Sequence, residues 1–188
     1  AIPNMRWDTA LHTMVSFLTN TNQQHYSGQA QLSYLSQMVG IVGLQVITPM
    51  MGLALVVATL RALMGGRTVA RQVDATDVRG DADVGNYWAD LIRPTLRFML
   101  PLCLLWSVML TSQGVPSTLA AGPVATPVDA SAGMKEQKIP LGPVAPMVAA
   151  KQLGTNGGGW YGPNSAVPLE NPTPFSNLLE MLAIILVP

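Results

Sequence analysis

A long apolar run without any charge, MVGIVGLQVITPMMGLALVVATL at residues 38–60, constrains the fold of this chain more than any other segment. As an α-helix it would reach about 34 Å at about 1.5 Å per residue, which is enough to cross the hydrocarbon core of a bilayer. Pro49 lies in the middle of the run, and membrane helices tolerate proline because neighbouring groups satisfy the carbonyl that it leaves free. We therefore expect a kinked membrane-spanning helix here.

The composition agrees with a membrane protein. Hydrophobic residues make up 49% of the 188 residues and charged residues 11%, whereas an ordinary soluble domain has about 25% charged residues. The formal net charge is zero, so no global field indicates nucleic acid or an acidic partner. The single cysteine, Cys103, excludes a disulfide framework.

A second spanning helix is predicted over residues 91–111, where Arg93 and Arg97 lie in the first turns and can extend to the lipid headgroups. A third apolar segment begins near Phe175 and stops before it is long enough to span. The chain also begins without an initiator methionine. We therefore expect a piece of a longer protein, cut at both ends.

The basic residues predict the orientation of the helices. Six arginines lie in or beside the loop between the two spans, and three lysines follow the second span; they are Arg61, Arg67, Arg71, Arg79, Arg93 and Arg97, and Lys135, Lys138 and Lys151. Positive residues mark the cytoplasmic side of a membrane. Residues 65–88 are therefore expected in the cytoplasm, and the opening segment and residues 112–174 outside.

Two polar segments on the same side look related: FLTNTNQQHYSG at 17–28 and QLGTNGGGWYGPNS at 152–165. Each contains a Thr-Asn pair followed by an aromatic residue and a glycine. Each also follows about ten residues that suit a short helix and precedes a long apolar segment. Pairing Thr19-Asn20 with Thr155-Asn156 gives an internal repeat with a period of 136 residues. This order is typical of re-entrant pore loops.

Physical chemistry supports that interpretation. Irregular backbone at membrane depth is tolerated only where it lines a path for water or ions, because unsatisfied peptide groups are costly in lipid. Gly157, Gly158 and Gly159 can adopt positive φ, so their carbonyls could turn to one side and replace the hydration shell of a cation. The negative ends of the short helices favour a cation, and neutral carbonyls favour a monovalent one.

The stretches SFLTNTNQQHYSGQAQLSYLSQM and LGTNGGGWYGPNSAVPLENPTPFSN resemble the first and second selectivity-filter regions of the KdpA family, the potassium-binding subunits of bacterial potassium-transporting ATPases. The resemblance covers nearly the whole chain, and LGTNGGG followed by ENPT is its most specific part. It implies an all-α membrane protein with ten spans and four re-entrant pore-helix and filter-loop repeats, related to K⁺ channels. Two of the four repeats are present here, incompletely.

The resemblance also implies the ion-binding residues, which are Thr19, Asn20, Thr21, Asn22, Gln24, Thr155, Asn156, Gly157, Gly158 and Gly159. K⁺ would be the transported ion, and no transition-metal site is expected. Four residues depart from the family pattern near the outer vestibule, namely Gln23, Gln29, Trp160 and Tyr161. The filter itself is intact.

The implied protein is a non-catalytic, multi-pass subunit in the bacterial plasma (inner) membrane, in contact with lipid and not with nucleic acid. Its expected partners are a P-type ATPase subunit, which hydrolyses ATP, and small accessory subunits. We expect six segments: 1–64 with the first pore helix, filter loop and span; 65–88, a cytoplasmic loop; 89–112, a span; 113–141, an external loop; 142–174, the second pore helix and filter loop; and 175–188, a truncated span.

Other interpretations are weaker. GTNGGG at 154–159 has the glycines of a phosphate loop, but Trp160 stands where the lysine is needed, and a strand would have to precede it. His12 and His25 lack the accompanying cluster of cysteine or carboxylate ligands that a metal site requires. The aspartates at 74, 77, 81 and 83 are interrupted by arginines and lack the glutamate of a calcium loop. A purely structural, helix-packing membrane piece remains the main alternative.

The stretch at 112–135 between the second span and the second polar segment is rich in proline, glycine, alanine and serine. Such a composition is typical of a linker. We expect it to have little fixed structure.

Overall fold

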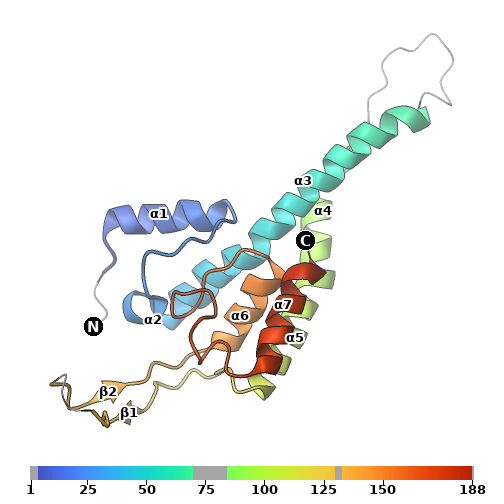
Figure 1. Ribbon diagram of the computed structural model, residues 1–188. Coiled ribbons are helices and arrows are strands. Elements are labelled where there is room, and N and C mark those ends of the chain that lie inside the picture. Colours follow the sequence, from blue (N-terminus) through green and yellow to red (C-terminus); the bar gives the residue numbers. More distant parts are fainter. Residues whose placement is uncertain (1–3, 70–83, 130–132, 188) are drawn as a thin grey trace.

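The computed structural model describes residues 4–69, 84–129 and 133–187, without the side chains of residues 65–69. It is mostly helical, as predicted (Figure 1). The elements in order are α1 (Trp7–Leu18), α2 (Gly28–Gln31), the π-helical η1 (Ser36–Ile41), α3 (Val42–Val69), α4 (Tyr87–Pro94), the π-helical η2 (Thr95–Met99), α5 (Leu100–Ser112), β1 (Val124–Ala125), β2 (Gln137–Lys138), α6 (Val144–Leu153) and α7 (Pro174–Leu186).

Two helices are long and apolar enough to cross a membrane, judged by length and composition: Ser36–Met64 and Tyr87–Ser112. They coincide with the two spans expected from the sequence. The π-helical turns η1 and η2 inside them were not predicted. Pro101 follows η2 and has no N–H to donate to the preceding turn, and a local change of helical winding is one way to accommodate such a gap.

Helix α6 lies at the centre of the packing, against α3, α5 and α7 (Figure 1). All of its residues except Pro146 are buried. Ala145, Ala149 and Ala150 lie in this buried helix, and small residues allow neighbouring helices to approach closely. At 10 residues and about 15 Å, α6 is too short to cross a bilayer, as predicted for a pore helix.

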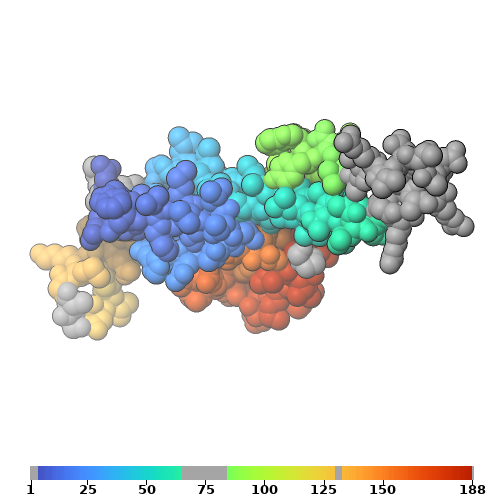
Figure 2. All heavy atoms as spheres, turned by 90° about the horizontal axis from the view of Figure 1, so that it is seen from above, coloured from blue at the N-terminus to red at the C-terminus, as the bar shows by residue number. Residues whose placement is uncertain are grey.

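Helix α1 is the counterpart of α6 at the start of the first polar segment, and its bounds match the predicted segment that starts at Trp7. It packs on α3, but only Thr13, Ser16 and Phe17 are buried. Seen from above, the blue N-terminal segment lies beside the orange segment that contains α6 (Figure 2). The two short helices thus lead into neighbouring parts of the molecule.

Helices α3 and α4 pack together, and Arg61 of α3 forms an ion pair with Asp90 of α4. This pair lies next to the predicted cytoplasmic loop. Most of that loop, including Arg71, Arg79 and the four aspartates considered above, lies outside the described residues.

The predicted linker is more ordered than its composition indicates. Strands β1 and β2 pair antiparallel, with Val124 opposite Lys138, and Ser117 forms an isolated bridge with Pro143. Gly122 packs so closely on the backbone of Ile139 that a Cβ would overlap its carbonyl. The expectation of little fixed structure is therefore wrong for the described part, because backbone pairing supplies order that side-chain composition does not reveal.

Candidate functional site

The first polar loop begins where α1 ends. Past Leu18 the chain turns back on the last helical turn through three backbone hydrogen bonds: Asn20 N to Phe17 O at 3.4 Å, Thr21 N to Ser16 O at 2.9 Å, and Asn22 N to Ser16 O at 3.1 Å. The Ser16 hydroxyl donates to the carbonyl of Gln23 at 3.2 Å. The end of the helix is thereby capped by its own loop.

The second polar loop leaves α6 with the same bonds. They are Thr155 N to Gln152 O at 3.1 Å, Asn156 N to Lys151 O at 3.2 Å, and Gly157 N to Lys151 O at 3.4 Å. Each bond of the first loop thus has a counterpart in the second. The two polar segments are a structural repeat and not only a similarity of composition.

The repeat has an offset of 135 residues, which is the separation of Asn22 from Gly157 and of Gln24 from Gly159. Positive φ follows this register: Asn20 (60°) matches Thr155 (54°), and Asn22 (49°) matches Gly157 (74°). The period of 136 inferred from the Thr-Asn pairs is therefore wrong by one residue. The bonds are counted from the helix end, so backbone geometry and not residue identity sets the register.

Equivalent residues of the two loops bond to each other. The Gln24 side chain pairs with Gly159 in both directions, since its Oε1 accepts from Gly159 N at 2.6 Å and its Nε2 donates to Gly159 O at 3.1 Å. Asn22 Nδ2 donates to Gly157 O at 3.4 Å. Two segments far apart in the chain are thereby joined into one site.

Helix α3 supports both loops. Gln45 Nε2 donates to Gly157 O at 3.2 Å, and Asn156 Nδ2 donates to the Gln45 carbonyl at 2.8 Å. The Thr48 hydroxyl donates to Asn20 Oδ1 at 2.9 Å. No role was expected for Gln45 or Thr48, although polar residues within an apolar span are a known signal of functional contact.

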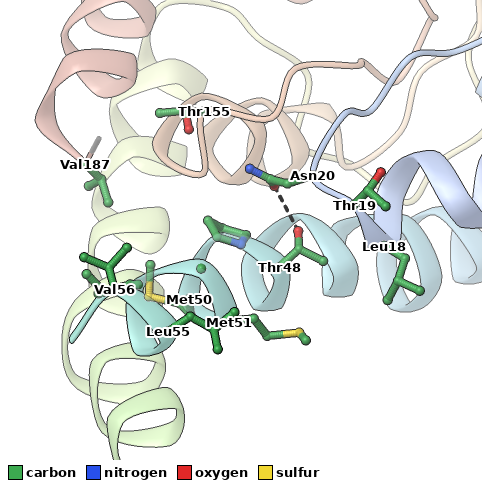
Figure 3. A pocket seen from close by; sticks show the side chains of 13 residues that line it. Leu18, Thr19, Asn20, Thr48, Met50, Met51, Leu55, Val56, Thr155 and Val187 are labelled. Carbon is green, nitrogen blue, oxygen red and sulfur yellow. Dashed lines mark hydrogen bonds between the residues drawn. The ribbon is translucent and has the colours of Figure 1, made fainter. Parts of the chain in front are cut away.

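A cavity of about 460 Å³ lies between the loops and α3. Figure 3 shows Thr19, Asn20 and Thr155 at its rim, with the dashed Thr48–Asn20 bond, and apolar side chains of α3 such as Met50 and Val56 around it. Asn20 and Thr155 are equivalent positions in the two loops. The polar ends of both loops thus face one shared space.

Thr19 and Thr21 are exposed, and their hydroxyls lie 3.1 Å apart. The Thr19 hydroxyl also donates to the carbonyl of Val15 at 2.9 Å, within its own helix end. Among the described residues, neither side chain bonds to the second loop. Their hydroxyl groups therefore stay with the first loop.

The three glycines of the second loop are required for two different reasons, backbone conformation and lack of space for a Cβ. Gly157 and Gly158 have positive φ, at 74° and 79°. Gly159 does not, so the expectation of positive φ is wrong there. A Cβ on Gly159 would lie 2.7 Å from a carboxylate oxygen of Glu170, so this position needs glycine for space.

A buried ion pair behind the second loop was missed. Lys151 of α6 and Glu170 are both fully buried and form a salt bridge. Glu170 Oε1 accepts from Tyr161 N at 3.0 Å, and its Oε2 accepts from Ser165 N at 3.1 Å. Lys151 was expected among the cations of an external loop, which is wrong because its side chain is inside the protein. The specific ENPT stretch contained Glu170, but its partner is 19 residues away.

The rival sites find little support in the geometry. Helix α6 precedes Gly154, where a phosphate loop requires a strand. The rings of His12 and His25 lie 4.5 Å apart. Within the described ranges, no group of three His, Cys, Asp or Glu side chains could hold a metal ion.

Comparison with known proteins agrees with the resemblance described above. The family model for the potassium-transporting ATPase A subunit, KdpA, matches residues 1–188. The chain is 46% identical over 187 residues to the potassium-transporting ATPase potassium-binding subunit of Pseudomonas putida, and 44% identical over 186 residues to that of Nitratidesulfovibrio vulgaris. These alignments cover 100% and 99% of this chain and 30% of each relative. The chain therefore belongs to the KdpA family.

Proposed function

We propose that this chain supplies the first two potassium-selecting loops of a membrane-embedded potassium-binding subunit, and that both loops are re-entrant. The observation that carries the proposal is the pairing of equivalent residues, Asn22 with Gly157 and Gln24 with Gly159, at the ends of two short helices. Loops that surround one ion path have to lie side by side, and these bonds hold the two loops together. The relatives are named as potassium-binding subunits, and this name identifies K⁺ as the ion that we propose for the site.

The chemistry of the site suits a monovalent cation. Both short helices point their C-termini, which carry partial negative charge, toward the loops. Three buried charged groups lie behind the second loop: Lys151 pairs with Glu170, and Glu180 accepts a hydrogen bond from the side chain of Gln152. Selection would then depend on carbonyl and side-chain oxygens at fixed positions, because none of the ten proposed ion-binding residues carries a charge.

In the complete protein these loops would be two of four. K⁺ would enter from outside, and a separate P-type ATPase subunit would hydrolyse ATP, with small accessory subunits in the complex. The chain itself would bind and pass the ion without catalysing a reaction. Residues 65–88 would face the cytoplasm of a bacterial cell and residues 113–141 the exterior, in a multi-pass protein of the inner membrane.

The competing function is a helix-packing piece of the same complex that never contacts the ion. Transport by the complete complex in proteoliposomes separates the two. Gly157→Ala should weaken selective K⁺ uptake, because a side chain at φ 74° is strained and its Cβ would lie 3.2 Å from Asn164 Oδ1. The matched control is Gly133→Ala, at φ 72° with open space around it. Equal, unchanged uptake in both variants would favour the packing role.

A further inference from the structure

Pro49 leaves one carbonyl of α3 without its helical donor. In an α-helix the N–H of each residue bonds to the carbonyl four residues earlier, and proline has no N–H. The acceptor that loses its partner is the carbonyl of Gln45, a residue that is 0% exposed. A buried acceptor without a donor is strongly unfavourable, so another group has to reach it.

The donor comes from the second filter loop. Asn156 Nδ2 lies 2.8 Å from the Gln45 carbonyl, and Asn156 is itself buried. Gly154 permits this approach, since a Cβ there would lie 2.7 Å from the same carbonyl oxygen. The bond therefore depends on a proline in one segment and on a glycine and an asparagine in another, more than a hundred residues away.

Gln45 also returns a bond to the loop. Its Nε2 donates to the carbonyl of Gly157 at 3.2 Å, so α3 fixes the orientation of the peptide group next to Asn156. One turn further along α3, Thr48 bonds to Asn20 of the first loop. This part of α3 is thus a common support for both loops.

From this geometry we infer that Asn156 is a positioning residue, whose side chain holds the second filter loop on the carbonyl that Pro49 frees, and that this bond sets the direction of the neighbouring backbone carbonyls. Its amide nitrogen then acts on ion selection through the backbone of the loop. The inference rests on the proposed function, since it assumes that the carbonyls of Thr155 and Asn156 meet the ion; the Gly157 carbonyl already accepts from Gln45 and Asn22.

A double-mutant cycle in the complete ATPase complex tests it. Asn156→Leu keeps the volume and removes the donor, and Pro49→Ala returns an N–H that recaptures the Gln45 carbonyl within the helix. Each single variant should raise the half-saturating K⁺ concentration about fivefold, the scale of one hydrogen bond, and reduce the preference for K⁺ over Rb⁺. The double variant should be no worse than the worse single variant, because both changes break the same bond.

Effects that multiply in the double variant would overturn the inference, as would unchanged ion response in both single variants. Pro94→Ala in α4 and the exposed Asn177→Leu in α7 are matched controls that should leave the ion response unchanged. If Asn156→Leu alone prevents assembly of the complex, Pro49→Ala in the same chain should restore it, and failure of that rescue also contradicts the inference.

The variant Gly158→Ala shows whether a contradicting result concerns only the positioning role of Asn156 or also the proposed function. If Gly158→Ala alters ion preference while the cycle gives multiplying effects, only the positioning role is wrong. If Gly158→Ala also leaves ion preference unchanged, the loop does not select the ion and the proposed function fails with it.

Discussion

The Lys151 ammonium group and the Glu170 carboxylate form an ion pair in which both side chains are fully buried. The backbone of Lys151 holds the N–H groups of Asn156 and Gly157, and Glu170 holds those of Tyr161 and Ser165. The pair therefore connects the incoming and outgoing ends of the second polar loop. It is a brace for the loop, placed where it contributes no net charge.

The first prediction concerns this brace. Lys151→Met should destabilise the protein by about 3–5 kcal/mol, because it leaves a buried carboxylate without its cation. Glu170→Gln in the same chain should recover part of the loss, since glutamine has no charge to compensate. Thermal unfolding of the purified complex is the measurement. Arg6→Met, which breaks the exposed Arg6–Asp8 pair, is the control and should cost about 1 kcal/mol or less. Equal unfolding temperatures for Lys151→Met and Arg6→Met would refute the prediction.

The second prediction concerns the contact between the loops. Gln24→Met keeps the length of the side chain and removes both bonds to Gly159, so the apparent K⁺ affinity of the complex should fall about tenfold. That factor corresponds to about 1.4 kcal/mol, the scale of one or two hydrogen bonds. Gln23→Met is the matched control, since the Gln23 side chain is exposed. Titration of ATPase activity with K⁺ measures both, and an equal response of the two variants would contradict the role of Gln24.

The third prediction concerns orientation. In the full-length protein with Cys103 replaced by serine, a cysteine at Val128 should react with a membrane-impermeant maleimide on intact cells, and a cysteine at Val84 only after permeabilisation. Both native side chains are exposed, so access depends on the side of the membrane. Labelling of the cysteine at Val84 on intact cells, and of the cysteine at Val128 only after permeabilisation, would contradict the topology inferred from the arginines.

The fourth prediction is that the isolated chain does not transport. In the proposed ring of four loops, this chain supplies only two, so vesicles that contain this chain alone should show no selective K⁺ flux. Flux assays with a K⁺-responsive dye check this. Robust selective flux that persists when the chain is diluted to one copy per vesicle would disprove the need for the other repeats.

The sequence predicted the helices better than the contacts between them. Residues 38–60 and 91–111 are apolar enough to predict spans by themselves. The helix that starts at Trp7 was also predictable, because helix formation depends on residues close together in the sequence. The π-helical turns and the pairing of β1 with β2 depend on neighbouring backbone, which no composition reveals.

The site divides in the same way. The polar loops were recognisable because threonine, asparagine and glycine are unusual beside long apolar segments. Their register was not, because residue identity favoured Thr19 opposite Thr155 whereas the hydrogen bonds place Asn20 there. Lys151 was assigned to solvent, since a lysine is buried only when a partner such as Glu170 reaches it, and that partner is set by the tertiary fold.

The central claim is that the backbone of the second loop selects potassium, and Gly158 tests it most directly. Gly158 has φ 79°, and a Cβ there would lie 3.1 Å from Gln24 Oε1, so Gly158→Ala strains the loop at its contact with the first loop. Tyr161→Phe removes only the hydrogen bond from the tyrosine hydroxyl to the carbonyl of Pro140, a residue that lies before α6 and outside the loop. Gly133→Ala imposes a similar backbone strain in the segment between β1 and β2.

The decisive measurement is ATPase activity of the reconstituted complex titrated with K⁺, Rb⁺ and Na⁺. Our account predicts that Gly158→Ala lowers the apparent affinity for K⁺ and narrows its preference over Rb⁺ and Na⁺ by about tenfold, equivalent to about 1.4 kcal/mol. Tyr161→Phe and Gly133→Ala should keep the ion ranking of the unmodified protein. An unchanged K⁺ affinity and ion ranking in Gly158→Ala would contradict the claim and leave helix packing as the role of this loop.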